Sequence, residues 1–62
     1  MPVIRISLWK GRTPEQKKAL SKAFTDSMTD ILKVRPESVQ IIFDEVDREN
    51  WAIGGKIQDG NP

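Results

Sequence analysis

The groups in this sequence that could do acid–base or nucleophilic chemistry are few, because it contains neither histidine nor cysteine. Carboxylates and lysines remain, together with one unusual amine. Removal of Met1 ahead of a small residue would leave Pro2 as a free N-terminal secondary amine. An α-amino group titrates at about 7.7–8.0, and an apolar pocket or a nearby cation would lower its pKa. Such an amine could carry protons or attack a carbonyl to form an iminium.

Pro2 also has a purely structural interpretation. It precedes the alternating apolar residues of "VIRISLW" (3–9), and proline is tolerated as the first residue of a strand. Backbone chemistry alone favours this simpler interpretation. It does not exclude the free amine, so both alternatives stay open at this level.

Other kinds of site are not expected. Gly55 and Lys56 resemble the end of a phosphate-binding loop, but that motif needs glycine at 50 and serine or threonine at 57, where the chain has Asn50 and Ile57. The acidic run 44–47 is typical of a solvated strand end, so neither a metal nor a cofactor is predicted. A net charge of +1, with basic residues interleaved with acidic ones, argues against a nucleic-acid partner.

The elements that must position Pro2 can be read from the local pattern. A strand is expected over 3–9, followed by a helix that begins with a capping box of Thr13 and Gln16 around Pro14. Pro36 disfavours helical geometry at the residue before it, so the helix should end near Lys33. Its apolar face comprises Ala19, Leu20, Ala23, Phe24, Ser27, Met28, Ile31 and Leu32; the opposite face carries Lys17, Lys18, Lys22, Thr25, Asp26 and Thr29.

A second strand over 39–46 and a short hairpin or arm over 51–57, with Gly54 and Gly55 as its turn, complete the expected fold. The whole chain, 1–62, forms one α/β domain, a single βαβ unit with parallel strands and a C-terminal hairpin, and 58–62 should be a frayed tail. Parallel sheets are normally covered on both faces, and only one helix is available. The chain should therefore assemble into a homo-oligomer.

The charge distribution and the hydropathy indicate which ligands and which cellular location to expect. Residues 1–35 contain eight basic and three acidic residues, whereas 36–62 contain two basic and six acidic residues. The basic first half could steer an anionic ligand or help subunits associate. No apolar run is long enough for a membrane span and no signal-peptide pattern is present, so a soluble, cytoplasmic protein without a membrane partner is expected.

Taken in order, "PVIRISLWKGRTPEQKKAL", "SVQIIFDEV" and "NWAIGGK" resemble the 4-oxalocrotonate tautomerase family over nearly the whole chain. The resemblance implies a βαβ fold, a homohexamer built from dimers, and a cofactor-free isomerase acting on a small anionic enol or keto acid. It also implies that Pro2 is the general base of a keto–enol tautomerisation and that Arg12 binds a substrate carboxylate. Trp51 matches an aromatic residue of the apolar pocket wall, and Trp9 replaces a leucine that often lines the site.

Gln40 departs from the pattern of the best-studied branch, in which this position is an arginine contributed from a neighbouring subunit. Glutamine still donates hydrogen bonds to substrate but lacks the charge and the bidentate fork. Turnover of a dicarboxylate such as 2-hydroxymuconate is therefore expected to be weakened. Two alternatives remain: a non-catalytic assembly module in which Met1 is retained, and another iminium-forming or decarboxylating enzyme on the same scaffold.

Overall fold

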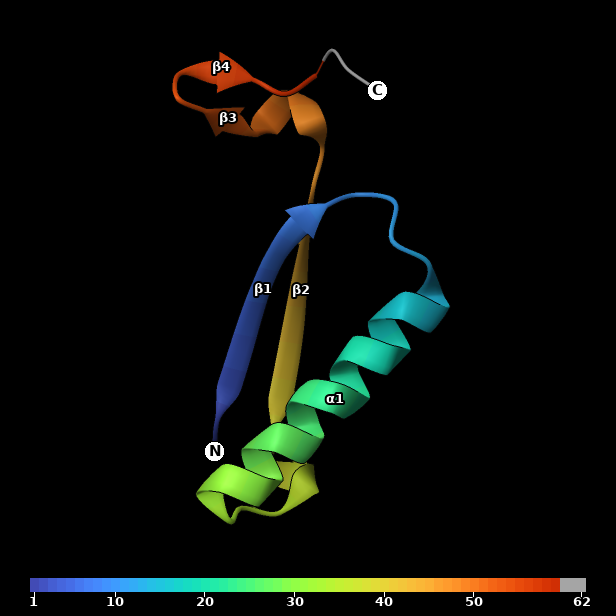
Figure 1. Ribbon diagram of the computed structural model, residues 1–62, viewed down its shortest axis with the longest axis vertical. Helices are drawn as coiled ribbons and strands as arrows, with labels where there is room; N and C mark the ends of the chain where they lie inside the picture. Colours follow the sequence, from blue (N-terminus) through green and yellow to red (C-terminus); the bar gives the residue numbers. More distant parts are fainter. Residues whose placement is uncertain (60–62) are drawn as a thin grey trace.

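The computed structural model describes residues 1–59, which form a two-stranded parallel sheet, one long helix and a small terminal hairpin (Figure 1). In chain order the elements are β1 (Val3–Trp9), α1 (Pro14–Leu32), the short 3-10 helix η1 (Pro36–Ser38), β2 (Gln40–Val46), the 3-10 helix η2 (Arg48–Asn50), β3 (Ala52–Ile53) and β4 (Lys56–Ile57). The predicted βαβ unit and its C-terminal hairpin are thus confirmed. The expected frayed tail falls partly outside the described residues, because 60–62 are not among them.

β1 and β2 pair in parallel from Val3 opposite Gln40 to Trp9 opposite Val46. The return from the end of one strand to the start of the next is made by α1, which lies across the sheet (Figure 1). Side chains alternate along a strand, so Ile4, Ile6 and Leu8 share one face with Ile41, Phe43 and Glu45. The other face carries Arg5, whose Nε donates to Asp44 Oδ2 at 3.0 Å.

Helix α1 begins and ends where the local signals predict. The Gln16 amide donates to the Thr13 hydroxyl at 3.1 Å, and the Thr13 amide donates to Gln16 Oε1 at 3.0 Å, which closes the capping box. At the other end Lys33 adopts the left-handed conformation with a φ of 59° and donates its amide to Thr29. Such a residue satisfies an end carbonyl and stops the helix.

The face that α1 turns inward differs from the predicted apolar face at one important position. Lys17, assigned by the pattern to the outer face, is half-buried because its ammonium group pairs with Glu45 of β2. Meanwhile Ala19 and Ala23 are exposed, and Ile31 keeps 74% of its surface exposed. The apolar stripe is therefore broader than the part that the chain's own sheet covers.

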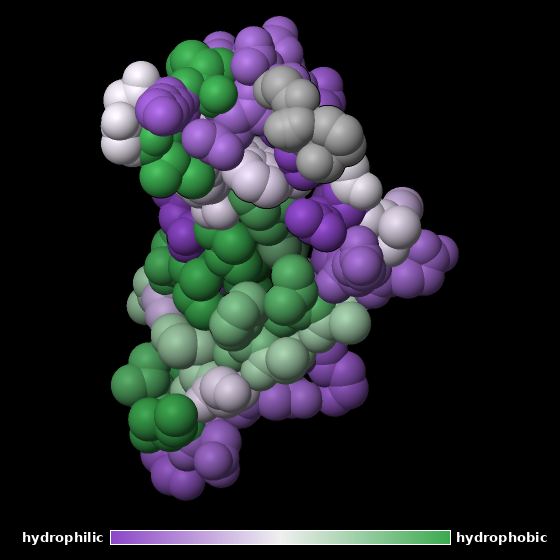
Figure 2. Space-filling view, turned by 45° about the horizontal axis from the view of Figure 1, so that its top comes forward, coloured by the Kyte–Doolittle hydropathy of each residue, from purple (hydrophilic) through white to green (hydrophobic). Residues whose placement is uncertain are grey.

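Much of the apolar surface of a single chain remains open. No side chain of residues 1–59 is fully buried, and Val3, Leu32, Ile53 and Ile57 each expose half of their surface or more. Figure 2 shows apolar side chains gathered across the middle of one face. The Cα radius of gyration is 14.6 Å, against about 11 Å for a compact domain of this length. The chain is flat and extended, measuring 42 × 24 × 13 Å.

Candidate functional site

The residues that the sequence marks for chemistry lie at two opposite ends of the sheet. Pro2 and Gln40 are at the end where both strands begin, and Trp9 is at the end where β1 stops. Seven strand residues at about 3.3 Å each separate these ends by roughly 20 Å. One chain therefore cannot bring Pro2 into contact with the aromatic wall predicted for its own pocket.

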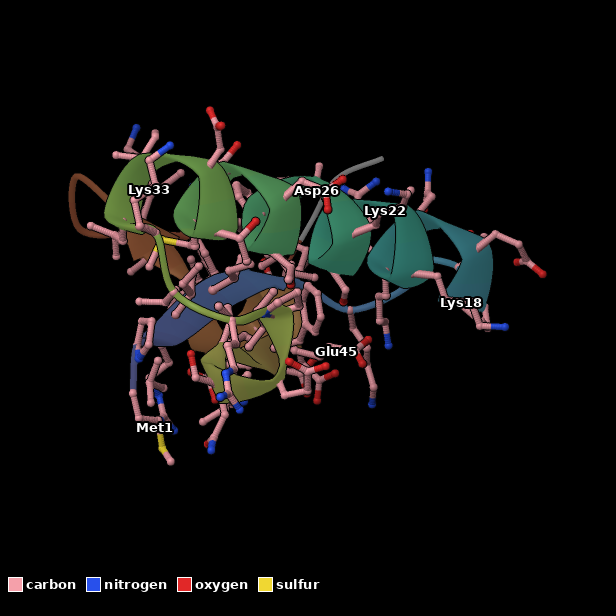
Figure 3. All side chains as sticks on the ribbon, turned by 90° about the horizontal axis from the view of Figure 1, so that it is seen from below. Met1, Lys18, Lys22, Asp26, Lys33 and Glu45 are labelled. Atoms are coloured by element: carbon pink, nitrogen blue, oxygen red, sulfur yellow. The ribbon has the colours of Figure 1, made fainter. Side chains whose placement is uncertain are left out.

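At the first end, Gln40 lies directly beside Pro2. The Gln40 amide donates to the Pro2 carbonyl oxygen at 3.0 Å, extending the β1–β2 ladder by one bond. The side-chain Nε2 of Gln40 lies 3.1 Å from the sulfur of Met1. Met1 itself is 84% exposed and projects away from α1 (Figure 3), whereas Pro2 is half-buried. Removal of Met1 would uncover the Pro2 nitrogen without disturbing the β1–β2 ladder.

At the opposite end, the two tryptophans form an edge-to-face pair. The ring centroids of Trp9 and Trp51 are 5.8 Å apart and their planes make an angle of 71°. Trp51 is placed by the backbone: its amide donates to the Arg48 carbonyl at 3.1 Å, and its carbonyl accepts from the Gln58 amide at 2.9 Å. The sequence predicted both tryptophans as pocket residues but gave no signal that they would touch.

Arg12 lies at the same end as the tryptophans, in the loop between β1 and α1. Its side chain is exposed and makes no hydrogen bond or ion pair with other residues of 1–59. It stands immediately before the N-cap of α1, where a cation opposes the helix dipole. Gly11 makes the preceding turn with a φ of 111°, a conformation that side chains rarely adopt. The loop thus presents a cation at a helix N-terminus, which is a favourable place for an anion.

Glu45 of β2 holds the loop between β1 and α1 in place. It lies on the helix-facing side of β2, where it pairs with the Lys17 ammonium group and accepts from the Gly11 amide. Figure 3 shows Glu45 reaching toward the N-terminal half of α1. The hydrogen bond from Lys17 lowers the pKa of the Glu45 carboxyl from its ordinary 4.5, against the opposing effect of partial burial, and the Gly11 amide and Lys10 add to the lowering. The sequence did not predict this support.

Residues 1–59 enclose no pocket within a single chain. Nor do they contain a group of three or more acidic side chains placed to hold a metal ion. No helix among these residues has the length and apolar character needed to cross a membrane.

Comparison with known proteins turns this arrangement into a family assignment. A model of the tautomerase enzyme family matches residues 2–59, which is nearly all of the described chain. The chain belongs to the tautomerase family. It is accordingly an isomerase of the tautomerase type, and the resemblance noted from its sequence is confirmed.

Individual members of the family are similar over most of their length. The probable tautomerase K2 of Dickeya dadantii is 42% identical over 57 residues, covering 90% of this chain and 85% of the relative. A crystal structure of a 4-oxalocrotonate tautomerase homologue superposes with a TM-score of 0.92 at 34% identity, covering 100% of this chain and 98% of that one. A heterohexameric 4-oxalocrotonate tautomerase from Chloroflexus aurantiacus J-10-fl superposes with a TM-score of 0.87 at 31% identity, covering 94% of each chain.

The Glu45 support predicts a specific acid dependence of stability. A carboxyl whose pKa is lowered by folding stabilises the fold above its unfolded value, here 4.5, and loses that contribution as the pH falls through the lowered pKa. We expect the melting temperature of Glu45→Gln to fall less steeply than that of the wild type as the pH drops below about 4.5. Thermal melts between pH 3 and pH 7 would measure this.

The matched control is Glu37→Gln, which removes an exposed carboxyl from η1. The fall of its melting temperature at acid pH should follow that of the wild type. If the melting temperature of Glu45→Gln fell with acid in the same way as that of the wild type, the loop between β1 and α1 would not depend on this carboxylate.

Proposed function

We propose that this tautomerase uses the secondary amine of Pro2, exposed by removal of Met1, as the general base of a cofactor-free keto–enol tautomerisation. Its substrate is a 2-hydroxydienoate or a related enol acid. The observation that carries the proposal is that the family match begins at Pro2 in a chain without histidine or cysteine. A prolyl amine near neutral pH is then the best-suited base that the chain offers.

The proposed reaction moves one proton between oxygen and carbon. The Pro2 nitrogen accepts the proton of the enol hydroxyl, and the electron pair of the broken O–H bond forms the carbonyl. The carbon end of the delocalised anion then takes the proton back from the prolinium. Arg12 binds the substrate carboxylate and draws negative charge away from the reacting carbons. The apolar surfaces of Trp9 and Trp51 lower the pKa of the amine by disfavouring its charged form.

This mechanism requires more than one copy of the chain, because Pro2 and the Arg12–tryptophan end are roughly 20 Å apart within a single copy. We propose that copies pack through their open apolar surfaces into a homohexamer, a trimer of dimers, so that the Pro2 end of one copy meets the Arg12 end of another. The broad apolar stripe of α1, the uncovered sheet face and the flat shape of the chain all support this. The heterohexameric relative gives a precedent for the number of subunits.

Gln40 shapes which acid is preferred. Its main-chain amide donates to the Pro2 carbonyl, and its side-chain Nε2 lies 3.1 Å from the sulfur of Met1. Once Met1 is removed, this Nε2 can donate a hydrogen bond to the substrate near the reacting oxygen. It brings no positive charge there, which favours an enol monoacid over a second carboxylate at that end of the site.

Replacing the base tests the mechanism directly. Pro2→Ala keeps a terminal amine but changes it from secondary to primary, and we expect it to lose at least about 100-fold in the ketonisation rate of phenylenolpyruvate, within the range that general-base catalysis contributes. Intact mass must first establish that Met1 is absent from both proteins. A wild-type rate in the processed variant, or full activity of a wild type that retains Met1, would contradict the role of the Pro2 amine.

Mixing two impaired variants tests the shared site. We expect Arg12→Ala to raise KM for carboxylate substrates by roughly 10- to 100-fold, because a charged hydrogen-bond pair is lost. Pro2→Ala and Arg12→Ala subunits, unfolded together and refolded, should then recover activity by forming interfaces with one intact site. Lysates mixed without subunit exchange are the control. Recovery no greater than the sum of the separate proteins would show that the two residues do not meet across copies.

A further inference from the structure

The sheet face that α1 does not cover carries an ion pair among apolar side chains. Because side chains alternate along each strand, the middle of this face is formed by Val3, Arg5, Ser7, Ile42 and Asp44. Arg5 stands opposite Ile42 in the register, so it reaches diagonally along the sheet to Asp44. Its Nε donates to Asp44 Oδ2 at 3.0 Å and its Nη2 donates to Oδ1 at 3.5 Å.

This ion pair contributes little to the fold of a single chain. The Arg5 side chain keeps 65% of its surface exposed and that of Asp44 keeps 36%, and an ion pair in contact with water is weak because solvent screens both charges. Its neighbours Val3 and Ile42 are apolar and expose 53% and 38% of their surfaces. A parallel sheet normally has both faces covered, so the pair lies in a surface that is suited to burial.

The hydrogen-bonding capacity of the pair indicates what covers this face. Burying an ion pair is costly unless its remaining donors and acceptors are also satisfied, so a purely apolar partner fits poorly. Within residues 1–59 Arg5 uses Nε and Nη2 on Asp44. Its Nη1 group and further acceptor positions on the carboxylate are left for a partner.

A second copy of the chain has the matching groups. It brings one guanidinium and one carboxylate on the same face, in the same arrangement. A facing copy can therefore place its Asp44 against the free Nη1 of Arg5, and its own Arg5 against the free oxygen positions of Asp44. A surface that carries both charges is complementary to itself, as the interface of a symmetric oligomer must be.

We propose that Arg5 and Asp44 are the residues by which this sheet face recognises a second copy of the same chain. In the assembly, the Arg5 of each copy pairs with the Asp44 of the facing copy, and the apolar residues around them are buried. The inference rests on the assembly proposed above but not on the roles of Pro2 and Arg12. It makes the pair a determinant of partner choice, because like charges brought together across an interface oppose association strongly.

Charge reversal on this face tests the role directly. Arg5→Asp leaves two carboxylates on the face and Asp44→Arg leaves two guanidinium groups, so we expect neither variant to assemble like the wild type on size-exclusion chromatography. The two variants are then unfolded together, refolded and examined by native mass spectrometry. The ratio of mixed to homogeneous particles should exceed the statistical ratio by at least about 10-fold, because opposite charges meet only between unlike copies.

The matched control reverses an ion pair on the outer side of α1. Lys22 Nζ lies 2.8 Å from Asp26 Oδ2, and both side chains are exposed (Figure 3). Lys22→Asp and Asp26→Lys change the net charge by the same amounts as the two sheet variants. Each should assemble like the wild type, and the two together should mix in the statistical ratio.

A milder pair of variants decides the question if charge reversal prevents folding. Arg5→Gln and Asp44→Asn each remove one charge without placing like charges side by side within a chain, and loss of an exposed ion pair costs little stability. Circular dichroism checks that both variants fold. After refolding together, they should form mixed particles in excess of the statistical ratio by about 2- to 10-fold, since only unlike copies pair Arg5 with Asp44.

The outcomes separate this inference from the proposed function. Statistical mixing of the folded variants, or assembly of each charge-reversed variant alone like the wild type, would overturn the role of the pair while leaving the assembly and the Pro2 mechanism intact. A monomeric wild type would overturn both this role and the proposed assembly. Preferential mixing would support the role even if Pro2→Ala retained full activity, in which case the proposed mechanism alone would fail.

Discussion

The parallel pairing of β1 with β2 is the constraint on which the remaining structure depends. Two parallel strands need a crossover as long as the strands themselves, and α1 provides it on one face of the sheet. The pairing also aligns the starts of both strands, Pro2 with Gln40, and the ends of both strands, Trp9 with Val46. Every residue with a proposed chemical role is thereby assigned to one end or the other.

The two ends differ in how they are built. The Pro2 end is simple, because a single main-chain hydrogen bond to Gln40 fixes the residue. The Arg12 end is assembled from several segments: the capping box orders the start of α1, Glu45 holds Gly11 and Lys17, and Arg48 of η2 lies over the ring of Trp9 at the end of β1. A site that binds a charged ligand requires such fixed donors, because donors that do not have to reorganise stabilise the charge more strongly. The base proposed at Pro2 requires only that its nitrogen be accessible and weakly hydrated.

Most of the fold could be predicted from the sequence, because the deciding signals are local. The capping residues around Pro14, the proline that follows the helix and the Gly54–Gly55 turn each act within a few positions of where they stand. The inward position of Lys17 could not be predicted, because its partner Glu45 is 28 residues away and comes into reach only when the strands pair. The stacking of Arg48 on Trp9 has the same origin. The roles of Pro2 and Arg12 came from the family resemblance, since residue chemistry alone left Pro2 ambiguous.

The separation of Pro2 from Arg12 by the length of β1 has a consequence for how such genes can diverge. In the shared site proposed above, each chain contributes its two ends to two different sites, so a chain does not need both ends to be intact. After a duplication, one copy could keep the amine and lose the arginine loop, while its sister kept the loop and lost the amine, and the pair together would retain complete sites. With the proposed shared site, a strand of seven residues allows one ancestral protein to become two obligate partners by loss of residues alone.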